Sequence, residues 1–422
     1  MTNVSAATTE HDVLVVGAGL AGLQCARTLQ REGVNVAVWD AGDQVGGRIR
    51  TDLIDGFRLD RGFQVLNPAY PAIKEHIDIN ALGMQMFGSG VGVRSEDRFA
   101  MLVDPIREPA LASELLRSGL LAPVDVIALA RWAGPALAPP SWVKNARDAQ
   151  RGESMDAVGL TGPLREVMEA FLAGVVLEDE GTTSMNFMRL LLRMFVFGSP
   201  GLPRLGMQAL PQQIADELGD AVTTGVQVAS IEQGRRRAIV HTADGRTASA
   251  RLVVVATGAT AAQSLVGVKA PEMKGVVADW FTMDEAPDMP PMLVVDGRGP
   301  KAGPVKNAAV ISAAAPTYAP PGRHLVQASS LMHGGRSAAT EQVLDHTGEL
   351  FGVDTRGWQL IHRHEVPEAL PSQPAPLRTR QAMRVSRSVI VAGDHMDTAS
   401  IQGAMVSGER AAQGYLQHIS HT

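Results

Sequence analysis

Near the start of the chain, short apolar runs alternate with a segment of helical length. Residues 12–17 (DVLVVG) form a β-branched run that is typical of a buried parallel strand, and a helix is predicted over 20–32, ending at Gly33. A second strand is predicted over 34–39 and ends at Asp40. Together these elements predict a complete βαβ unit and hence an α/β fold.

Between residues 71 and 201 the pattern changes to Leu-, Ala- and Met-rich segments that proline and glycine interrupt. Helices are predicted over 108–118, 124–133 and 183–197. This part of the chain is therefore interpreted as a helical insertion, whose apolar residues either line a tunnel or simply form core.

The second half of the chain has mainly a strand pattern. Segments 222–231, 237–242 and 247–256 alternate or run apolar with turns between them, which predicts a β-meander that ends in a buried strand. The segment 56–66 alternates and is expected to be irregular. The remaining predicted elements are a helix from 210 to 218, strands within 276–328, a helix over 337–351, a strand over 388–393 and a last helix over 403–418.

Composition narrows the choice of partners. Charged residues make up 19% of the chain and the net charge is −6, which argues against nucleic acid as a partner. The single cysteine, Cys25, excludes an internal disulfide and a thiolate zinc site, and it favours a cytoplasmic location. No metal-ligand spacing is present in the sequence, and no apolar run reaches the roughly 18 residues of a spanning helix. Peripheral membrane attachment stays open.

The first chemical motif is the run Gly17-Ala18-Gly19-Leu20-Ala21-Gly22, between the first strand and the first helix. In a dinucleotide-binding loop of this pattern, Gly17 makes the tight turn, Gly19 lets the backbone approach a pyrophosphate, and Gly22 lets helix and strand pack closely. Asp40 lies where an acidic residue binds the ribose hydroxyls. The motif predicts a bound dinucleotide with the phosphates at the start of the helix.

After Asp40 the sequence continues with Ala41 and, five residues further, with Gly46-Gly47-Arg48. This extended pattern resembles the flavoprotein group that contains flavin amine oxidases, protoporphyrinogen oxidase and phytoene desaturases. The resemblance implies FAD as the cofactor, with Gly46, Gly47 and Arg48 at its diphosphate and ribityl region. An arginine fork beside a diphosphate is also a strong charge-assisted contact on physical grounds.

The resemblance extends over the whole chain. The segment 393–412 resembles the group's C-terminal flavin motif, the segment 253–258 its sheet-closing strand, and the segment 58–64 the part beneath the flavin ring. The further cofactor contacts that the resemblance implies are Gly62, Phe63, Gln64, Val228, Ala256, Gly393, Asp394, Ile401, Gln402 and Ala404.

We therefore expect a glutathione-reductase-like FAD-binding Rossmann domain with an inserted α+β substrate domain. The FAD-binding domain is expected to be discontinuous and to comprise residues 1–70, 203–275 and 380–422. The substrate-binding domain is expected to comprise residues 71–202 and 276–379. Only one dinucleotide fingerprint is visible, so O2 or a quinone is the expected electron acceptor for the reduced flavin.

The substrate is harder to predict from the sequence. Amine oxidases of the group usually carry an aromatic residue where this chain has Ser400, and a lysine beside flavin N5 has no clear counterpart. An aromatic cage would have to come from Trp280, Phe281 or Tyr318, and the lysines Lys274, Lys301 and Lys306 lie in apparent loops.

The spacing of residues 400–408 is closer to that of phytoene desaturases. The leading prediction is therefore C–C dehydrogenation of a small hydrophobic substrate by hydride transfer to flavin N5. An amine oxidase that cleaves a C–N bond and a flavin-binding protein without turnover are the alternatives. The sequence identifies no catalytic residue. His395 and Ser400 are candidates because they adjoin the last flavin motif, and His362 and His364 lie on an apparent strand.

Overall fold

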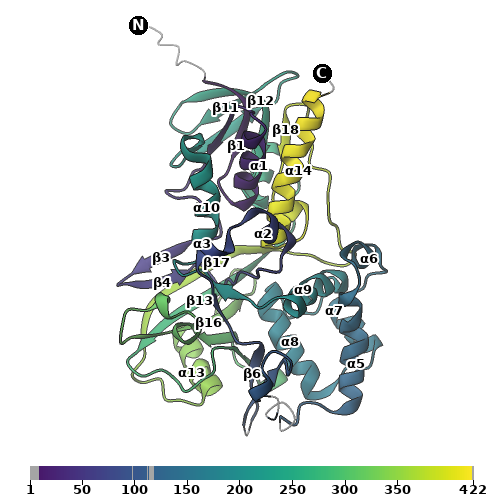
Figure 1. The fold of residues 1–422 in the computed structure, drawn as a ribbon, viewed down its shortest axis with the longest axis vertical. Helices are drawn as coiled ribbons and strands as arrows, with labels where there is room; N and C mark the ends of the chain where they lie inside the picture. The colour runs from purple at the N-terminus through teal and green to yellow at the C-terminus, as the bar shows by residue number, and fades with distance from the viewer. Residues whose placement is uncertain (1–8, 97, 112, 114–117, 421–422) are drawn as a thin grey trace.

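The computed structural model describes residues 9–420 except 97, 112 and 114–117, and two large sheets organise it (Figure 1). The first sheet draws strands from the beginning, the middle and the end of the chain. They are β1 (Thr9–Val16), β2 (Val36–Trp39), β9 (Val222–Thr223), β10 (Val228–Glu232), β11 (Ala238–Thr242), β12 (Thr247–Val255) and β18 (Val389–Val391). The central strand β1 pairs in parallel with β2 and β12, and β18 pairs in parallel with β12. The strands β10, β11 and β12 form the predicted antiparallel meander.

Two helices from opposite ends of the chain, α1 (Leu20–Arg31) and α14 (Ile401–Ser420), lie side by side against one face of this sheet (Figure 1). Their contact is close because Gly408 adjoins the backbone of α1: a Cβ at Gly408 would lie 2.1 Å from the carbonyl oxygen of Ala21. Cys25 of α1 is fully buried, as expected for a packing residue.

The second sheet has the order β17 (Gln359–Pro371), β13 (Met273–Met283), β16 (His324–Met332), β15 (Val305–Val310), β14 (Leu293–Asp296), β6 (Gly90–Arg94) and β7 (Phe99–Val103). All neighbours are antiparallel except β14 and β6. One face packs on α13 (Thr340–Phe351) through an apolar cluster that includes Val343, Leu350 and Phe351. The helix α8 (Gly162–Val176) packs against the sheet through Val167, which contacts Val93 and Val295.

The helical insertion contains α5 (Pro123–Ala133), α6 (Pro140–Asn145), α7 (Arg151–Ala157), α8 and α9 (Met185–Phe197). The other elements are α2 (Pro71–His76), α3 (Ile79–Leu82), β3 (Thr51–Ile54), β4 (Phe57–Asp60), β5 (Gln85–Met86), β8 (Gly201–Leu202), α10 (Ala209–Leu218), α11 (Ala259–Val266) and α12 (Ile311–Ala314). No helix in the described part of the chain is long and apolar enough to cross a membrane.

Several sequence expectations need correction. The expected single strand 222–231 is split into β9, which pairs with β2, and β10, which pairs with β11, because Gly225 turns the chain with φ +72°. The expected irregular segment 56–66 begins instead with β4, which pairs with β3 in a hairpin.

The expected helical insertion also contains strands, because β6 and β7 complete the second sheet. In the span of the helix expected over 108–118, the structure describes a 3-10 turn over Pro109–Leu111 and a helical Ser113. Residues 112 and 114–117 lie outside the described residues, so this helix stays a prediction. The expected division into two domains stays a prediction. Strands of the first sheet fall in the expected FAD-binding segments, and those of the second fall in the expected substrate-binding segments, apart from the first residues of β13.

Candidate functional site

A cavity of about 790 Å³ connects the predicted dinucleotide loop with the helical insertion and the second sheet. At one end it is lined by the loop after β1, the tip of β2 and the Gly46–Arg48 segment. At the other end the lining comes from α8, α9 and the strands β13, β14, β15, β16 and β17. Residues far apart in the sequence thus line one cavity.

The glycines of the first motif each meet a different packing demand. A Cβ at Gly17, which has φ +107°, would lie 2.6 Å from the carbonyl oxygen of Ala256, and a Cβ at Gly22 would lie 1.9 Å from the carbonyl oxygen of Gly17. At Gly19, by contrast, a Cβ would meet nothing within 4 Å. The loop therefore presents bare backbone and open space beside the start of α1, as a diphosphate requires.

Asp40 is held at the tip of β2 by the backbone around it. Its Oδ2 accepts a hydrogen bond from the amide of Ala18 at 2.6 Å, and its Oδ1 accepts one from the amide of Gly42 at 2.7 Å. The carboxylate lines the cavity in this fixed orientation and keeps acceptor capacity on both oxygens. This arrangement fits the hydroxyls of a ribose.

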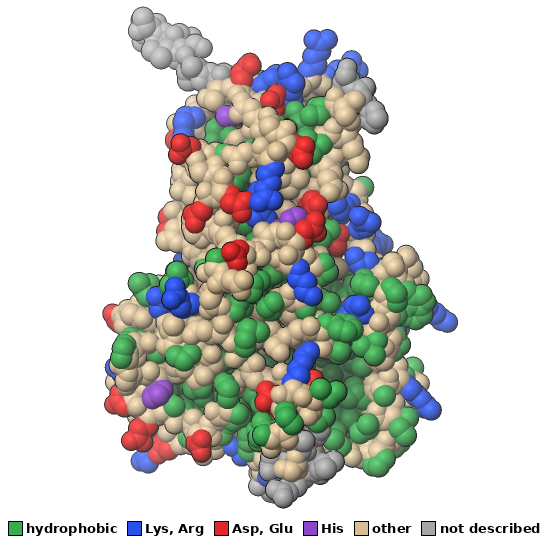
Figure 2. Space-filling view, viewed as in Figure 1, with side chains coloured by type: hydrophobic (Ala, Val, Ile, Leu, Met, Phe, Trp, Pro, Cys, Tyr) green, Lys and Arg blue, Asp and Glu red, His purple; other side chains and the backbone are tan. Residues whose placement is uncertain are grey.

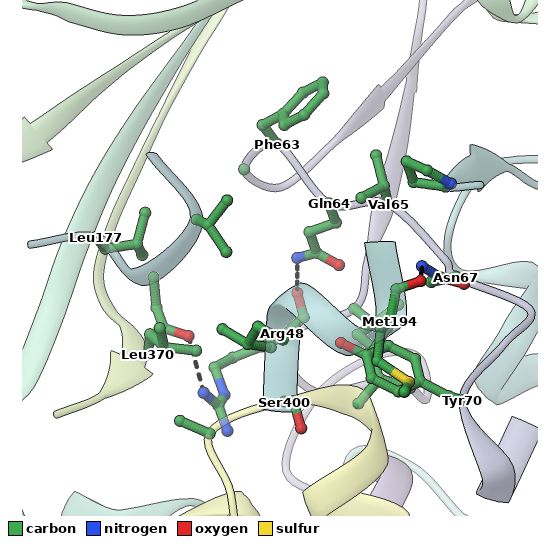
Figure 3. Close-up of a pocket in the computed structure, with 18 of the residues that line it drawn as sticks. Arg48, Phe63, Gln64, Val65, Asn67, Tyr70, Leu177, Met194, Leu370 and Ser400 are labelled. Carbon is green, nitrogen blue, oxygen red and sulfur yellow. Dashed lines mark hydrogen bonds between the residues drawn. The ribbon is translucent and has the colours of Figure 1, made fainter. Parts of the chain in front are cut away.

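Arg48 connects the second motif to the last one. Its Nη2 lies 2.6 Å from Oδ1 of Asp394, and its Nη1 donates to the carbonyl oxygen of Ala369 at 2.8 Å. Burial alone would lower the pKa of Arg48, but the Asp394 carboxylate outweighs it and raises that pKa. Figure 3 shows Arg48 between the Gln64 side chain and Ser400 at the start of α14. The ion pair places a cation and an anion in the cavity wall, beside the segments that carry the dinucleotide motifs.

Three buried oxygens in the cavity wall lack a hydrogen-bond partner among the described residues, and two of them lie in segments that resemble the flavin motifs. These two are Oε1 of Gln64, whose Nε2 donates to the carbonyl oxygens of Arg48 and Arg61, and Oγ1 of Thr257. Buried polar atoms are almost always paired, so such atoms indicate an absent polar partner. Together with the glycine cradle, they show that the site fits a dinucleotide.

Most of the predicted cofactor residues line this cavity. They are Gly17, Gly19, Leu20, Ala21, Asp40, Gly46, Gly47, Arg48, Gly62, Phe63, Gln64, Ala256, Gly393, Asp394, Ile401 and Ala404. Ala18, Gly22, Ala41, Val228 and Gln402 are not part of the lining. Val228 lies on β10, and Oε1 of Gln402 accepts a hydrogen bond from the amide of Ala72. Contacts of all these residues with a cofactor stay predictions.

The candidate catalytic residues differ in whether they line the cavity. Ser400 lines the cavity, and its Oγ accepts a hydrogen bond from the amide of Gly403 at 3.1 Å, which identifies it as a cap of α14. His395 is 4% exposed, but it does not line the cavity, and burial lowers its pKa. His364 of β17 is bound through Nε2 to Asp52, and burial lowers its pKa as well.

The three lysines named above are ion-paired, and they lie outside the cavity lining: Lys274 with Glu272, Lys301 with Glu96 and Lys306 with Asp179. The expectation that they lie in loops is wrong for Lys274 and Lys306, which belong to β13 and β15. Trp280, Phe281 and Tyr318 are buried elsewhere, so they form no aromatic cage in this cavity. The aromatic residues in the lining are Phe63, Tyr70, Phe87, Phe171 and Phe195.

Sequence reasoning missed the far half of the cavity. Its lining includes Phe171, Gly174, Val175, Leu177, Leu191, Leu192, Met194, Phe195, Val276, Leu293, Asn307, Ser329, Val366 and Leu370. These residues form no local motif, because five strands and two helices contribute them. The Leu- and Met-rich composition of α9 was the one signal available, and it pointed to an apolar tunnel or to core.

The fold and the cavity define an α/β protein of the dinucleotide-binding class, in which the part of the cavity that carries the dinucleotide motifs adjoins an apolar part. The sequence profile of the flavin-containing amine oxidoreductases matches residues 20–415, and the chain belongs to this family. It is accordingly an FAD-dependent oxidoreductase by family, and FAD is its cofactor, as the motifs predicted.

Individual relatives agree with this family. The putrescine oxidase of Kocuria rosea is 44% identical over 78 residues, which cover 18% of this chain and 16% of that protein. A putative flavin-containing monoamine oxidase of Mycobacterium tuberculosis is 27% identical over 277 residues, 58% of this chain and 56% of that protein. The matches thus span at most about half of these curated relatives.

The fold is also that of solved structures. The structure of a putative protoporphyrinogen oxidase from Exiguobacterium sp. 255-15 aligns with a TM-score of 0.72 and 15% identity, covering 98% of this chain and 100% of that one. The family match and the curated relatives, rather than the fold alone, favour the amine oxidase alternative over the leading sequence prediction of phytoene desaturase-like chemistry. The cap hydrogen bond of Ser400 gives a structural reason for this residue that does not depend on the kind of substrate.

Proposed function

We propose that this protein oxidises the C–N bond of an apolar monoamine. When bound, FAD supplies the acceptor for a hydride at N5, and O2 or a quinone removes the electrons. Family membership supports the C–N bond as the target. The observation that carries the choice of substrate is that every charge in the described cavity lining is ion-paired except Asp40, which lies at the predicted ribose position.

Six charged side chains line the cavity in the described residues, and each has a partner. Arg48 is paired with Asp394, Arg61 with Asp52, and Arg107 with Asp104, while Asp40 accepts two backbone hydrogen bonds. Asp40 is the one carboxylate in this lining without a cationic partner, and it is expected to bind the ribose, so none is left to receive a second ammonium group. Burial of an unpaired charge is costly, so a diamine is disfavoured against a monoamine with an apolar body.

The lining also offers no conventional base for the amine. It contains no histidine, cysteine or lysine among the described residues, and burial raises the pKa of Tyr70 to about 12. The reactive amine is therefore expected to enter already neutral, and the apolar wall of α8 and α9 favours this form. The chain contributes orientation and exclusion of water rather than proton transfer.

The test is anaerobic reduction of the FAD-loaded protein by benzylamine, heptan-1-amine and putrescine, followed as bleaching of the flavin absorbance. We expect both monoamines to bleach the flavin, with putrescine slower by at least about tenfold, which corresponds to 1.4 kcal/mol. Ammonia and hydrogen peroxide should form in air if O2 is the acceptor. The matched control is Gly19→Val. Nothing lies within 4 Å of a Cβ at this position, so the variant should fold, but the valine side chain would occupy the space of the diphosphate and prevent FAD binding.

Failure of all three amines to bleach the flavin would contradict the proposed reaction and favour a flavin protein without turnover.

A second candidate, C–C dehydrogenation of a hydrophobic substrate, is favoured by Ser400 in the lining and by the lysine-free cavity. This candidate would be selected if phytoene in detergent micelles bleaches the flavin of a preparation whose flavin stays oxidised with the amines.

We also propose that the protein attaches peripherally to a lipid surface around the cavity. Val196 lines the cavity and is 48% exposed, and the guanidinium of Arg107 donates to the carbonyl oxygens of Phe195 and Val196. Ile106, Leu137 and Phe197 are exposed as well. Figure 2 shows hydrophobic side chains gathered over the lower half of this face, where the surface is hollowed.

Co-sedimentation with phosphatidylcholine vesicles tests this attachment. Vesicle binding that is lost in Ile106→Asp would support the attachment. If the unaltered protein stays in the supernatant in the presence of vesicles, the attachment is contradicted. The cytoplasmic location inferred from the single cysteine likewise stays a proposal.

A further inference from the structure

A polar strip crosses the second sheet where it lines the cavity. Ala278 of β13 pairs with Ser329 of β16, and Ser329 pairs with Asn307 of β15. Residues paired across antiparallel strands project from the same face, and both Ser329 and Asn307 line the cavity. Each of them is 2% exposed. A largely apolar wall therefore carries two adjacent buried polar groups that the reaction proposed above does not use.

The hydrogen bonds of these groups are incomplete in a specific way. Gln327, on the same strand as Ser329, donates from Nε2 to Oγ of Ser329 at 2.8 Å. A hydroxyl that accepts this bond keeps its own hydrogen to donate. Oδ1 of Asn307 is buried and has no hydrogen-bond partner in the described residues. A donor and an acceptor are thus available side by side.

The helix opposite the strip confines the amide of Asn307. Gly174 of α8 also lines the cavity, and a Cβ at this position would lie 2.1 Å from Nδ2 of Asn307. Any larger residue on α8 would displace the amide. The glycine therefore keeps room for Asn307 in the cavity wall.

We propose that Asn307 and Ser329 form a hydrogen-bonding subsite for an uncharged carboxamide-like group at the end of the substrate remote from the amine. The N–H of this group donates to Oδ1 of Asn307, and its carbonyl oxygen accepts from Oγ of Ser329. Because the charges in the lining are paired, a carboxylate or a second ammonium would find no counter-ion there. The inference rests on the proposed amine oxidation only for the statement that the occupant is its substrate.

Equilibrium binding tests the subsite without turnover. The FAD-loaded, oxidised protein is titrated with hexanamide, which both donates and accepts, and with 2-heptanone, which only accepts, and the change in flavin absorbance gives each Kd. We expect hexanamide to bind at least about tenfold more tightly, because only the amide satisfies the buried acceptor. Asn307→Leu should remove this preference and leave the Kd of 2-heptanone within about twofold.

Two further variants and one control variant keep the test decisive. Ser329→Ala removes the donor and should weaken both ligands, and Gly174→Ala should weaken hexanamide by displacing Asn307 without removing a hydrogen-bonding group. Leu177→Met changes the cavity wall at an apolar position and should preserve the preference for hexanamide.

Three results would overturn the subsite: equal Kd values in the unaltered protein, a preference that survives Asn307→Leu, or loss of FAD in that variant, which would assign the strip to the cofactor. Hexanamide preference without any amine oxidation would leave the subsite standing and remove the proposed reaction. Amine oxidation without the preference would do the reverse.

Discussion

Replacement of Arg48 by methionine is the sharpest test of how the two ends of the chain are joined. In the FAD-free protein, Arg48→Met leaves the carboxylate of Asp394, whose side chain is 5% exposed, without its cation. Removing one partner of a buried ion pair costs about 3–5 kcal/mol. The side chain of Arg48 is 35% exposed, which allows water to compensate in part, so we expect the lower end, about 3 kcal/mol.

Urea unfolding of the FAD-free protein, followed by tryptophan fluorescence, measures this loss as a lower midpoint at unchanged slope. The double variant Arg48→Met with Asp394→Asn should be more stable than Arg48→Met alone by about 1 kcal/mol, because it carries no buried unpaired charge. A cost below about 1 kcal/mol for Arg48→Met, or strictly additive effects in the double variant, would refute the reasoning.

Three further predictions follow from burial and packing. Burial raises the pKa of the Cys25 thiol to about 12, so the native protein should not react with a thiol reagent at pH 8, whereas the unfolded chain should react with one equivalent. The value of kcat/KM for benzylamine should rise with pH towards the pKa of the amine, which lies well above neutral although below that of lysine, and Tyr70→Phe should leave this profile unchanged. A limb near pH 6–7 would reveal a base in the protein. Gly408→Val should drive α14 away from Ala21 and lower FAD content, whereas Gly414→Ala, with open space at its Cβ, should keep FAD and gain up to about 1 kcal/mol in stability.

The cofactor half of the site was predictable because local backbone geometry dictates its residues. The first strand turns directly into the first helix, and the contact between Gly22 and Gly17 leaves no room for a Cβ at Gly22. The need for glycine is therefore visible in the sequence within six consecutive positions. The same holds for Asp40, which follows a strand of clear pattern. Motifs of this kind can be recognised from the sequence because the strand and the helix beside them are predictable as well.

The substrate half was not predictable from the sequence, because strand register assembles it. Asn307 and Ser329 become neighbours only when β15 and β16 pair, and Gly174 reaches them only when α8 crosses the sheet. Nothing local to these positions distinguishes them from ordinary core residues. The split between β9 and β10 at Gly225 is a similar case, since their pattern of alternating residues was continuous while their partners differ.

The packing of α14 against α1 has a consequence for biosynthesis. Residues 32–400 must be translated after α1 is complete and before α14 begins, which takes about 20–75 s at roughly 5–20 residues per second. During this interval the glycine loop is present on the nascent chain, but Asp394 and the end of α14 that is predicted to face the flavin are not. We therefore expect FAD capture to be a late event, and a ribosome-stalled chain that ends before residue 393 should be unable to retain the cofactor.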